Sequence, residues 1–93
     1  AFGRDFRTRD GERVMVMGLT IRQWRALVEA TGTKESMAAL GHRLDLDLTK
    51  EGDRYLAREP IAALIEPWVQ ARELDQVAAA FGRYGVCWGR YQT

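Results

Sequence analysis

The chain has 93 residues, of which 46% are hydrophobic and 29% are charged. This composition is typical of one small soluble globular domain and excludes a disordered segment. The 14 basic and 13 acidic side chains leave a formal net charge of only +1, which argues against binding to nucleic acids or to membrane surfaces. The longest apolar stretches, such as residues 61–65, are too short to cross a bilayer.

The single cysteine, Cys87, excludes an internal disulfide and favours a reducing, cytoplasmic setting. The chain opens at Ala1 without an initiator methionine, and it stops at Thr93 within an extended stretch. We therefore expect residues 1–93 to form a single small domain that belongs to a larger polypeptide.

A β-hairpin is expected first. Polar and β-favouring side chains alternate over residues 5–8, and Asp10-Gly11 supplies a turn because glycine adopts positive φ at little cost. Residues 13–18 follow as a more continuous apolar strand. Such a run predicts burial on both faces of the strand.

Two helices should come next. Thr20 is placed to cap the first, Gln23 completes a capping-box pattern, and Gly32 ends the helix. Thr33 is placed to cap the second helix, over residues 34–44. The positions expected to face the core are Ile21, Trp24, Leu27 and Val28 in the first helix and Met37, Leu40 and Leu44 in the second.

Residues 51–58 are predicted to be helical, and Pro60 suits the first turn of a further helix. Pro67 lies within the apolar stripe of that helix, where it removes a backbone hydrogen bond. We therefore expect a kink or a break over residues 63–66.

A last helix is predicted over residues 74–84, ended by Gly85, and residues 86–88 form a closing strand. This strand should pair with the opening hairpin. The expected fold is α+β, with a three-stranded antiparallel sheet, made of the N-terminal hairpin and the C-terminal strand, and four or so intervening helices.

The sequence carries no recognisable catalytic constellation. His42, the only histidine, is expected on the surface, and no nucleophile can be placed beside it. Cys87 lies between Val86 and Trp88 and is expected to be a buried, structural thiol. The three tryptophans lie on apolar stripes, which favours a role in core packing.

Metal binding is not supported either. One histidine and one cysteine cannot supply a structural zinc site. The acidic stretch over residues 45–53 would need a glycine in place of Lys50 and an acid in place of Leu56 to be a calcium loop. A solvated link is the expected structure.

Two segments carry a resemblance to a known family. The first comprises residues 6–11, 14–16, 22–28 and Gly32, and the second runs from Arg54 to Gly89. Their order and spacing resemble the smaller domain of family III CoA-transferases, the group that contains formyl-CoA transferase, carnitine CoA-transferase and α-methylacyl-CoA racemase. The ending, residues 85–93, looks closest to a branch of isomerases that move CoA within one molecule.

The resemblance implies a parent enzyme whose substrate is a coenzyme A thioester. In this family a larger Rossmann-like domain carries the nucleophilic aspartate, the smaller domain helps to close the acyl pocket, and two subunits interlock. The aspartate has no counterpart in these 93 residues. We therefore expect the chain alone to be inactive, to bind no cofactor or metal, and to pair with the larger domain of the same polypeptide in a homodimer.

The resemblance also indicates where a pocket wall would form. The candidates are the residues that leave the second strand, Gly18, Leu19 and Thr20, and those of the last strand, Gly89, Arg90 and Tyr91. Arg90 is a candidate partner for a substrate carboxylate, although a solvated surface arginine is the commoner situation.

The racemase branch has an acidic catalytic residue near the position of Ile21. Isoleucine cannot exchange a proton with carbon, so racemisation is disfavoured and acyl-CoA transfer is favoured. The alternative is a stand-alone α+β interaction or regulatory domain without chemistry of its own. A domain of a larger enzyme should expose an apolar patch, whereas a free-standing module should cover its sheet edges.

Overall fold

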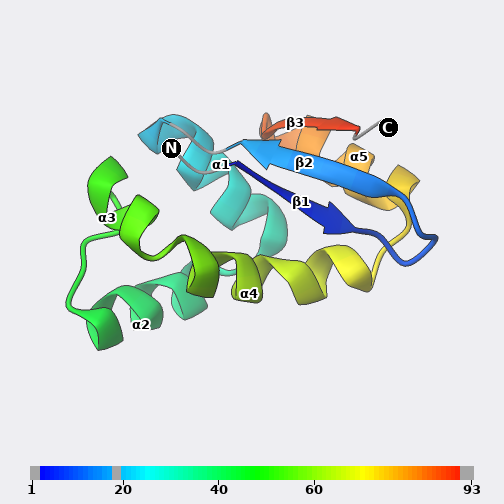
Figure 1. Cartoon of the computed structure of the whole chain (residues 1–93). Helices are drawn as coiled ribbons and strands as arrows, with labels where there is room; N and C mark the ends of the chain where they lie inside the picture. Colours follow the sequence, from blue (N-terminus) through cyan, green and yellow to red (C-terminus); the bar gives the residue numbers. More distant parts are fainter. Residues whose placement is uncertain (1–2, 18–19, 91–93) are drawn as a thin grey trace.

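The computed structural model describes residues 3–17 and 20–90 (Figure 1). Three strands and five helices form within these residues, in the order ββαααααβ. The elements are β1 (Gly3–Arg7), β2 (Arg13–Met17), α1 (Ile21–Thr31), α2 (Lys34–Leu44), α3 (Glu51–Leu56), α4 (Arg58–Gln70), α5 (Leu74–Tyr84) and β3 (Cys87–Arg90). The predicted α+β class and the three-stranded antiparallel sheet are confirmed.

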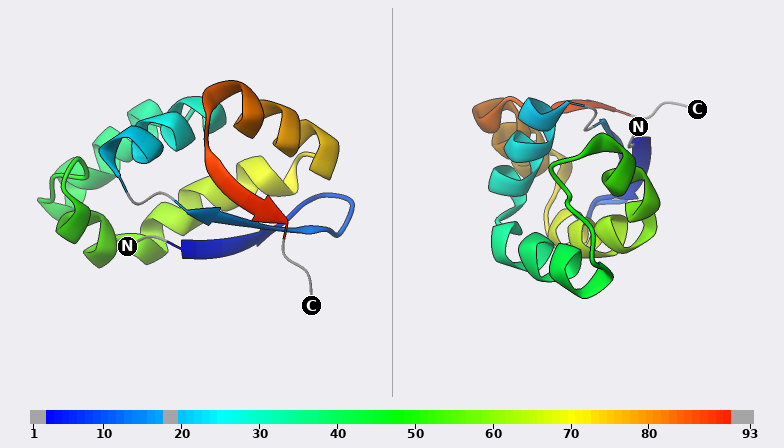
Figure 2. Two further views of the ribbon diagram at one scale, coloured as in Figure 1. Left: turned by 90° about the horizontal axis from the view of Figure 1, so that it is seen from above. Right: turned by 90° about the vertical axis from the view of Figure 1, so that its left-hand side faces the viewer.

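The sheet is antiparallel, with β2 between β1 and β3, and the helices gather on one side of it (Figure 2). The register pairs Phe6 with Val14 and Val16 with Trp88, which places these residues on one face. Phe6, Val14 and Val16 are buried there, whereas Arg13 is exposed and Met15 is half-buried. Burial of β2 on both faces is therefore wrong, because an antiparallel sheet covered on one side needs apolar side chains on that side only.

The core fills the space between the sheet and the helices. Its largest fully buried side chains come from β2, α1, α4 and α5, and they are Val14, Val16, Leu27, Ile61, Ile65, Val69, Val77 and Phe81. Trp68 stacks on Phe81 with ring centroids 5.5 Å apart, and Trp88 meets the same ring edge-on at 6.1 Å. With Trp24 also buried, the three tryptophans pack in or against the core, as predicted.

Local signals account for the bounds of α1 and α2. The Thr20 hydroxyl accepts a hydrogen bond from the Gln23 N–H at 3.1 Å, and Gly32 ends α1 in the left-handed conformation at φ 64°. Two expectations for α2 are wrong. Thr33 makes no capping bond and instead shares a hydrogen bond with the Thr31 hydroxyl, and Leu44 is 39% exposed because α2 ends at that residue.

Helix α4 runs unbroken from Arg58 to Gln70 with Pro67 inside it, so the predicted break does not occur. The proline ring deprives the Ala63 carbonyl of its helical donor. Pro67 and Ala63 are both exposed, so water can replace that donor without opening the helix.

The tip of the hairpin is fastened to the start of α5. The Arg9 N–H donates to the Arg72 carbonyl at 2.8 Å, and the Leu74 N–H donates to the Asp10 carboxylate at 3.1 Å. An exposed ion pair joins Arg9 to Glu73 at 3.0 Å. None of the helices in the described part of the chain has the length and apolar character of a membrane-spanning segment.

Two helical glycines differ in the room around them. A Cβ at Gly82 in α5 would meet no atom within 4 Å, whereas one at Gly41 in α2 would lie 3.0 Å from the Leu46 carbonyl oxygen. We expect Gly82→Ala to raise the free energy of unfolding by about 0.5–1 kcal/mol through helix propensity. Gly41→Ala should give no such gain, because the link after α2 must shift to admit the methyl group. Urea unfolding of both variants tests this, and an equal gain at both positions would contradict it.

Candidate functional site

The exit of β2 holds the first group of predicted pocket-wall residues. Gly18 and Leu19 lie outside the described residues. Thr20 is exposed at the start of α1, where its hydroxyl is engaged in capping the helix. This bond closes the first turn of α1.

The second predicted group lies along β3. Gly89 pairs with Met15 and Arg90 pairs with Val14, and Tyr91 lies outside the described residues. The Arg90 guanidinium is 2.8 Å from the Glu12 carboxylate, near the hairpin turn. Because β3 runs antiparallel to β2, Arg90 and Thr20 lie at opposite ends of β2, and the sheet does not bring them together.

The residue of β3 nearest to the β2 exit is Cys87, which pairs with Met17. Its thiol is exposed, so the prediction of a buried cysteine is wrong. Val86 is buried, and the alternation of side chains at the start of this edge strand turns the next residue outward. The Cys87 N–H donates to the Gln23 side-chain oxygen at 2.8 Å. Gln23 thus ties β3 to α1 instead of closing the predicted capping box.

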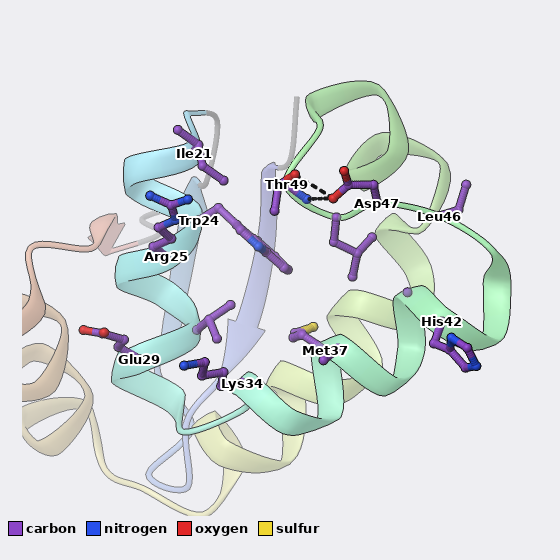
Figure 3. A pocket seen from close by; sticks show the side chains of 14 residues that line it. Ile21, Trp24, Arg25, Glu29, Lys34, Met37, His42, Leu46, Asp47 and Thr49 are labelled. Carbon is purple, nitrogen blue, oxygen red and sulfur yellow. Dashed lines mark hydrogen bonds between the residues drawn. The ribbon is translucent and has the colours of Figure 1, made fainter.

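A groove of about 440 Å³ lies on the side of α1 that faces α2 (Figure 3). It is bounded by α1, by α2 and by the link over residues 46–49. Its apolar lining includes Ile21, Trp24, Val28, Met37, Leu46 and Leu48, and polar side chains at its border include Arg25, Glu29, Lys34, His42 and Asp47. Ile21, the first residue of α1, follows Thr20 directly and also borders this groove, so the groove adjoins the predicted pocket wall.

The link that forms one wall of the groove has its own hydrogen bonds. The Asp47 carboxylate accepts from the Thr49 hydroxyl at 2.6 Å and from the Thr49 N–H at 3.0 Å. Both bonds lower the pKa of Asp47 below its ordinary value, and the bond from the Thr49 hydroxyl has the larger effect. The Asp53 carboxylate in turn accepts from the Asp47 N–H at 2.8 Å. In residues 3–17 and 20–90 no group of three or more acidic, histidine or cysteine side chains is arranged to hold a metal ion.

Arg54 supports this wall from inside and was not singled out from the sequence. Its side chain projects from α3 and is only 3% exposed. One guanidinium nitrogen donates to the Leu48 carbonyl at 2.9 Å, and the guanidinium carbon lies 5.7 Å from the centre of the Trp24 ring. Nothing in the sequence separates Arg54 from the exposed arginines, because its burial arises only when α3 folds onto the link.

Arg58 provides a matched comparison for Arg54. It donates to the Tyr55 carbonyl at 2.8 Å and lies 4.2 Å from the Tyr55 ring, but on the surface. We expect Arg54→Ala to lower the free energy of unfolding by about 2 kcal/mol or more, because it leaves a buried carbonyl without its donor and removes packed methylene groups. Arg58→Ala should stay within about 0.5 kcal/mol of the parent sequence. Equal effects in chemical denaturation would contradict the supporting role of Arg54.

Asp47 predicts a dependence of stability on pH. Because folding lowers its pKa, the Asp47 carboxylate stabilises the fold above the unfolded-state pKa, and this contribution is lost as the pH falls through the folded-state value. On acidification from about pH 6 to about pH 2, the chain should lose stability relative to the Asp47→Asn variant. Glu29→Gln, in the same groove, serves as the control. A difference between the chain and Asp47→Asn that is constant with pH would exclude this contribution.

Comparison with known proteins places the chain in a family. The sequence profile of CoA-transferase family III matches residues 1–93. Over 93 residues the chain is 55% identical to a 2-methylfumaryl-CoA isomerase from Chloroflexus aurantiacus. The match covers 100% of this chain but only 23% of the isomerase, so the chain spans about a quarter of the length of that relative. Because the family match extends over the whole chain, the chain belongs to CoA-transferase family III.

Proposed function

We propose that the chain is the smaller domain of an enzyme that moves CoA between carboxylic acids, and that it forms a wall of the acyl pocket. The observation that carries this proposal is the 55% identity to 2-methylfumaryl-CoA isomerase along the whole chain. By that likeness, the substrate of the parent enzyme is 2-methylfumaryl-CoA or a close analogue. CoA moves between the two carboxylates of the same acid.

The chemistry needs a nucleophile that this domain does not supply. In this transfer an enzyme carboxylate attacks the thioester carbon, an acyl anhydride forms and CoA leaves as a thiolate. The thiolate attacks the enzyme's carbonyl carbon of the anhydride, which gives an enzyme–CoA thioester and releases the acid as a carboxylate. The other carboxylate of the acid attacks that thioester to form a second anhydride, and the thiolate then attacks the acid's carbonyl carbon, which gives the new CoA thioester and frees the enzyme carboxylate. His42 and Cys87 are both exposed, on α2 and at the start of β3. We assign the nucleophilic carboxylate to polypeptide outside these residues, and to this chain the exclusion of water from the reacting carbons.

The start of α1 is the best-supported part of the wall. The Thr20 cap and the bond from Cys87 to Gln23 fix its first turn, so a side chain carried there keeps its position. We place Gly18 and Leu19 in the same wall. Arg90, with Gly89 and Tyr91, belongs to a second part of the wall, and the Arg90 guanidinium has to leave Glu12 before it can meet a substrate carboxylate.

Ile21 favours transfer over racemisation. It is half-buried at the border of the groove, and its alkyl side chain can neither donate nor accept a proton. The reaction proposed here moves CoA and leaves the configuration at carbon unchanged.

Exposed apolar side chains support docking onto a larger domain rather than a free-standing role. Leu56 is 67% exposed, Tyr55 is 49% exposed and Tyr84 is 41% exposed. A contiguous apolar patch on a surface marks where another domain packs, and Tyr55 and Leu56 are adjacent on α3. We propose the larger domain of the same polypeptide and a second subunit as the partners.

An activity assay separates this proposal from a stand-alone interaction domain. The full-length polypeptide that contains these residues should isomerise 2-methylfumaryl-CoA, with product followed by liquid chromatography and mass spectrometry. The 93-residue chain alone should give no turnover under the same conditions, because it lacks the nucleophile. A full-length protein that transfers CoA between no carboxylic acids would refute the proposed function. Turnover by the isolated chain would refute the division of labour.

A further inference from the structure

We propose that Gln23 is a positioning residue for CoA transfer, because its side chain ties the first turn of α1 to the sheet at the end of β2. This inference rests on the proposed function, in that the residues after β2 form a wall of the acyl pocket. Gln23 itself need not touch the substrate. It acts through the position of the wall residues that precede it in the chain.

Backbone and side-chain contacts enclose the corner between β2 and α1. Met17, the last residue of β2, pairs with Cys87, the first residue of β3. The Cys87 N–H donates to the Gln23 side-chain oxygen at 2.8 Å, and the Gln23 N–H donates to the Thr20 hydroxyl at 3.1 Å. The chain therefore runs from Met17 to Gln23 and is joined back to Met17 through Cys87.

The bond to Cys87 differs in kind from the helix cap. The Thr20 cap joins residues of one turn, so it determines only the local shape of α1. The bond between Cys87 and Gln23 spans 64 residues of the chain and relates α1 to the sheet. It is accepted by a side chain, so a substitution can remove it and leave the strand pairing and the cap in place. Gln23 can therefore be tested separately from both.

This bond is better suited to positioning than to stabilising the fold. Cys87 is exposed and Gln23 is half-buried, so water can replace either partner when the bond is lost. Its removal should therefore destabilise the protein little. A reaction, in contrast, slows by up to about 100-fold when a group that positions the substrate is misplaced by about 1 Å. A small shift of α1 relative to the sheet would affect catalysis before it affects unfolding.

Two substitutions of Gln23 in the full-length enzyme test this role. Leucine has a similar size but no acceptor, whereas glutamate keeps an acceptor oxygen at the same place along the side chain. With 2-methylfumaryl-CoA as substrate, Gln23→Leu should lower kcat by about tenfold or more and change KM by less than about threefold. Gln23→Glu should keep kcat within about threefold of the parent enzyme, because the Cys87 N–H retains an acceptor.

Gln70 provides a matched control. It is the exposed last residue of α4, which ends near the hairpin tip, and its side-chain amide donates to the Glu66 carboxylate at 3.4 Å. Gln70→Leu should leave kcat and KM as in the parent enzyme. The melting temperatures of all three variants should lie within about 4 °C of that of the parent. Hydrogen exchange at the Cys87 amide should be faster in Gln23→Leu than in the parent, which reports loss of the bond independently of turnover.

The outcomes separate this inference from the proposed function. An active parent enzyme whose kcat is unchanged in Gln23→Leu would overturn the positioning role alone, and so would an unchanged exchange rate at Cys87. Equal losses of kcat in Gln23→Leu and Gln23→Glu would also overturn it, because the acceptor would then be irrelevant. A fall in melting temperature of more than about 10 °C in Gln23→Leu would make the role a structural one and overturn it too. A parent enzyme with no CoA transfer would instead refute the proposed function.

Discussion

The structure depends on one constraint, which is that a three-stranded sheet buries only one of its faces. Phe6, Val14 and Val16 carry that face, and α1, α4 and α5 must cover it. The other elements follow from this arrangement. Helix α2 packs beside α4, and α3 returns the chain to the start of α1 (Figure 1). A polar replacement at Val14 or Val16 would remove the surface on which the three covering helices meet.

The same constraint divides the surface of α1 between two neighbours. Because α1 covers the sheet with one side and faces α2 with the other, Gln23 contacts β3 while Trp24 borders the groove. One helix therefore connects the end of β2, the start of β3 and the groove.

Local chemistry could be predicted from the sequence, and contacts between distant segments could not. Thr20 and Gly32 delimit α1 because a hydroxyl cap and a left-handed glycine act on the residues beside them. The roles of three residues could not be predicted because each depends on contacts between distant segments, and these residues are Cys87, Gln23 and Arg54. The exposure of Cys87 depends on the edge position of β3, the side chain of Gln23 was recruited by a strand 64 residues away, and Arg54 is buried only by the fold of α3. For the candidate site, the sequence pointed to two segments of the pocket wall, the residues after β2 and those of β3. Only the strand register shows that Thr20 and Arg90 lie at opposite ends of β2.

The attachment of the hairpin tip to the start of α5 has a consequence for how the molecule folds. Arg9 and Asp10 hold their positions through hydrogen bonds to Arg72 and Leu74, more than 60 residues later in the chain. Closing so long a loop is slow compared with forming a helix. The turn itself is closed by local bonds, such as that from the Thr8 N–H to the Glu12 carbonyl at 2.8 Å, so only its attachment to the start of α5 has to wait for that helix to dock. Amide hydrogen exchange at Arg9, whose N–H is bonded to Arg72, should accordingly follow the opening of the α5 region rather than that of the two strands.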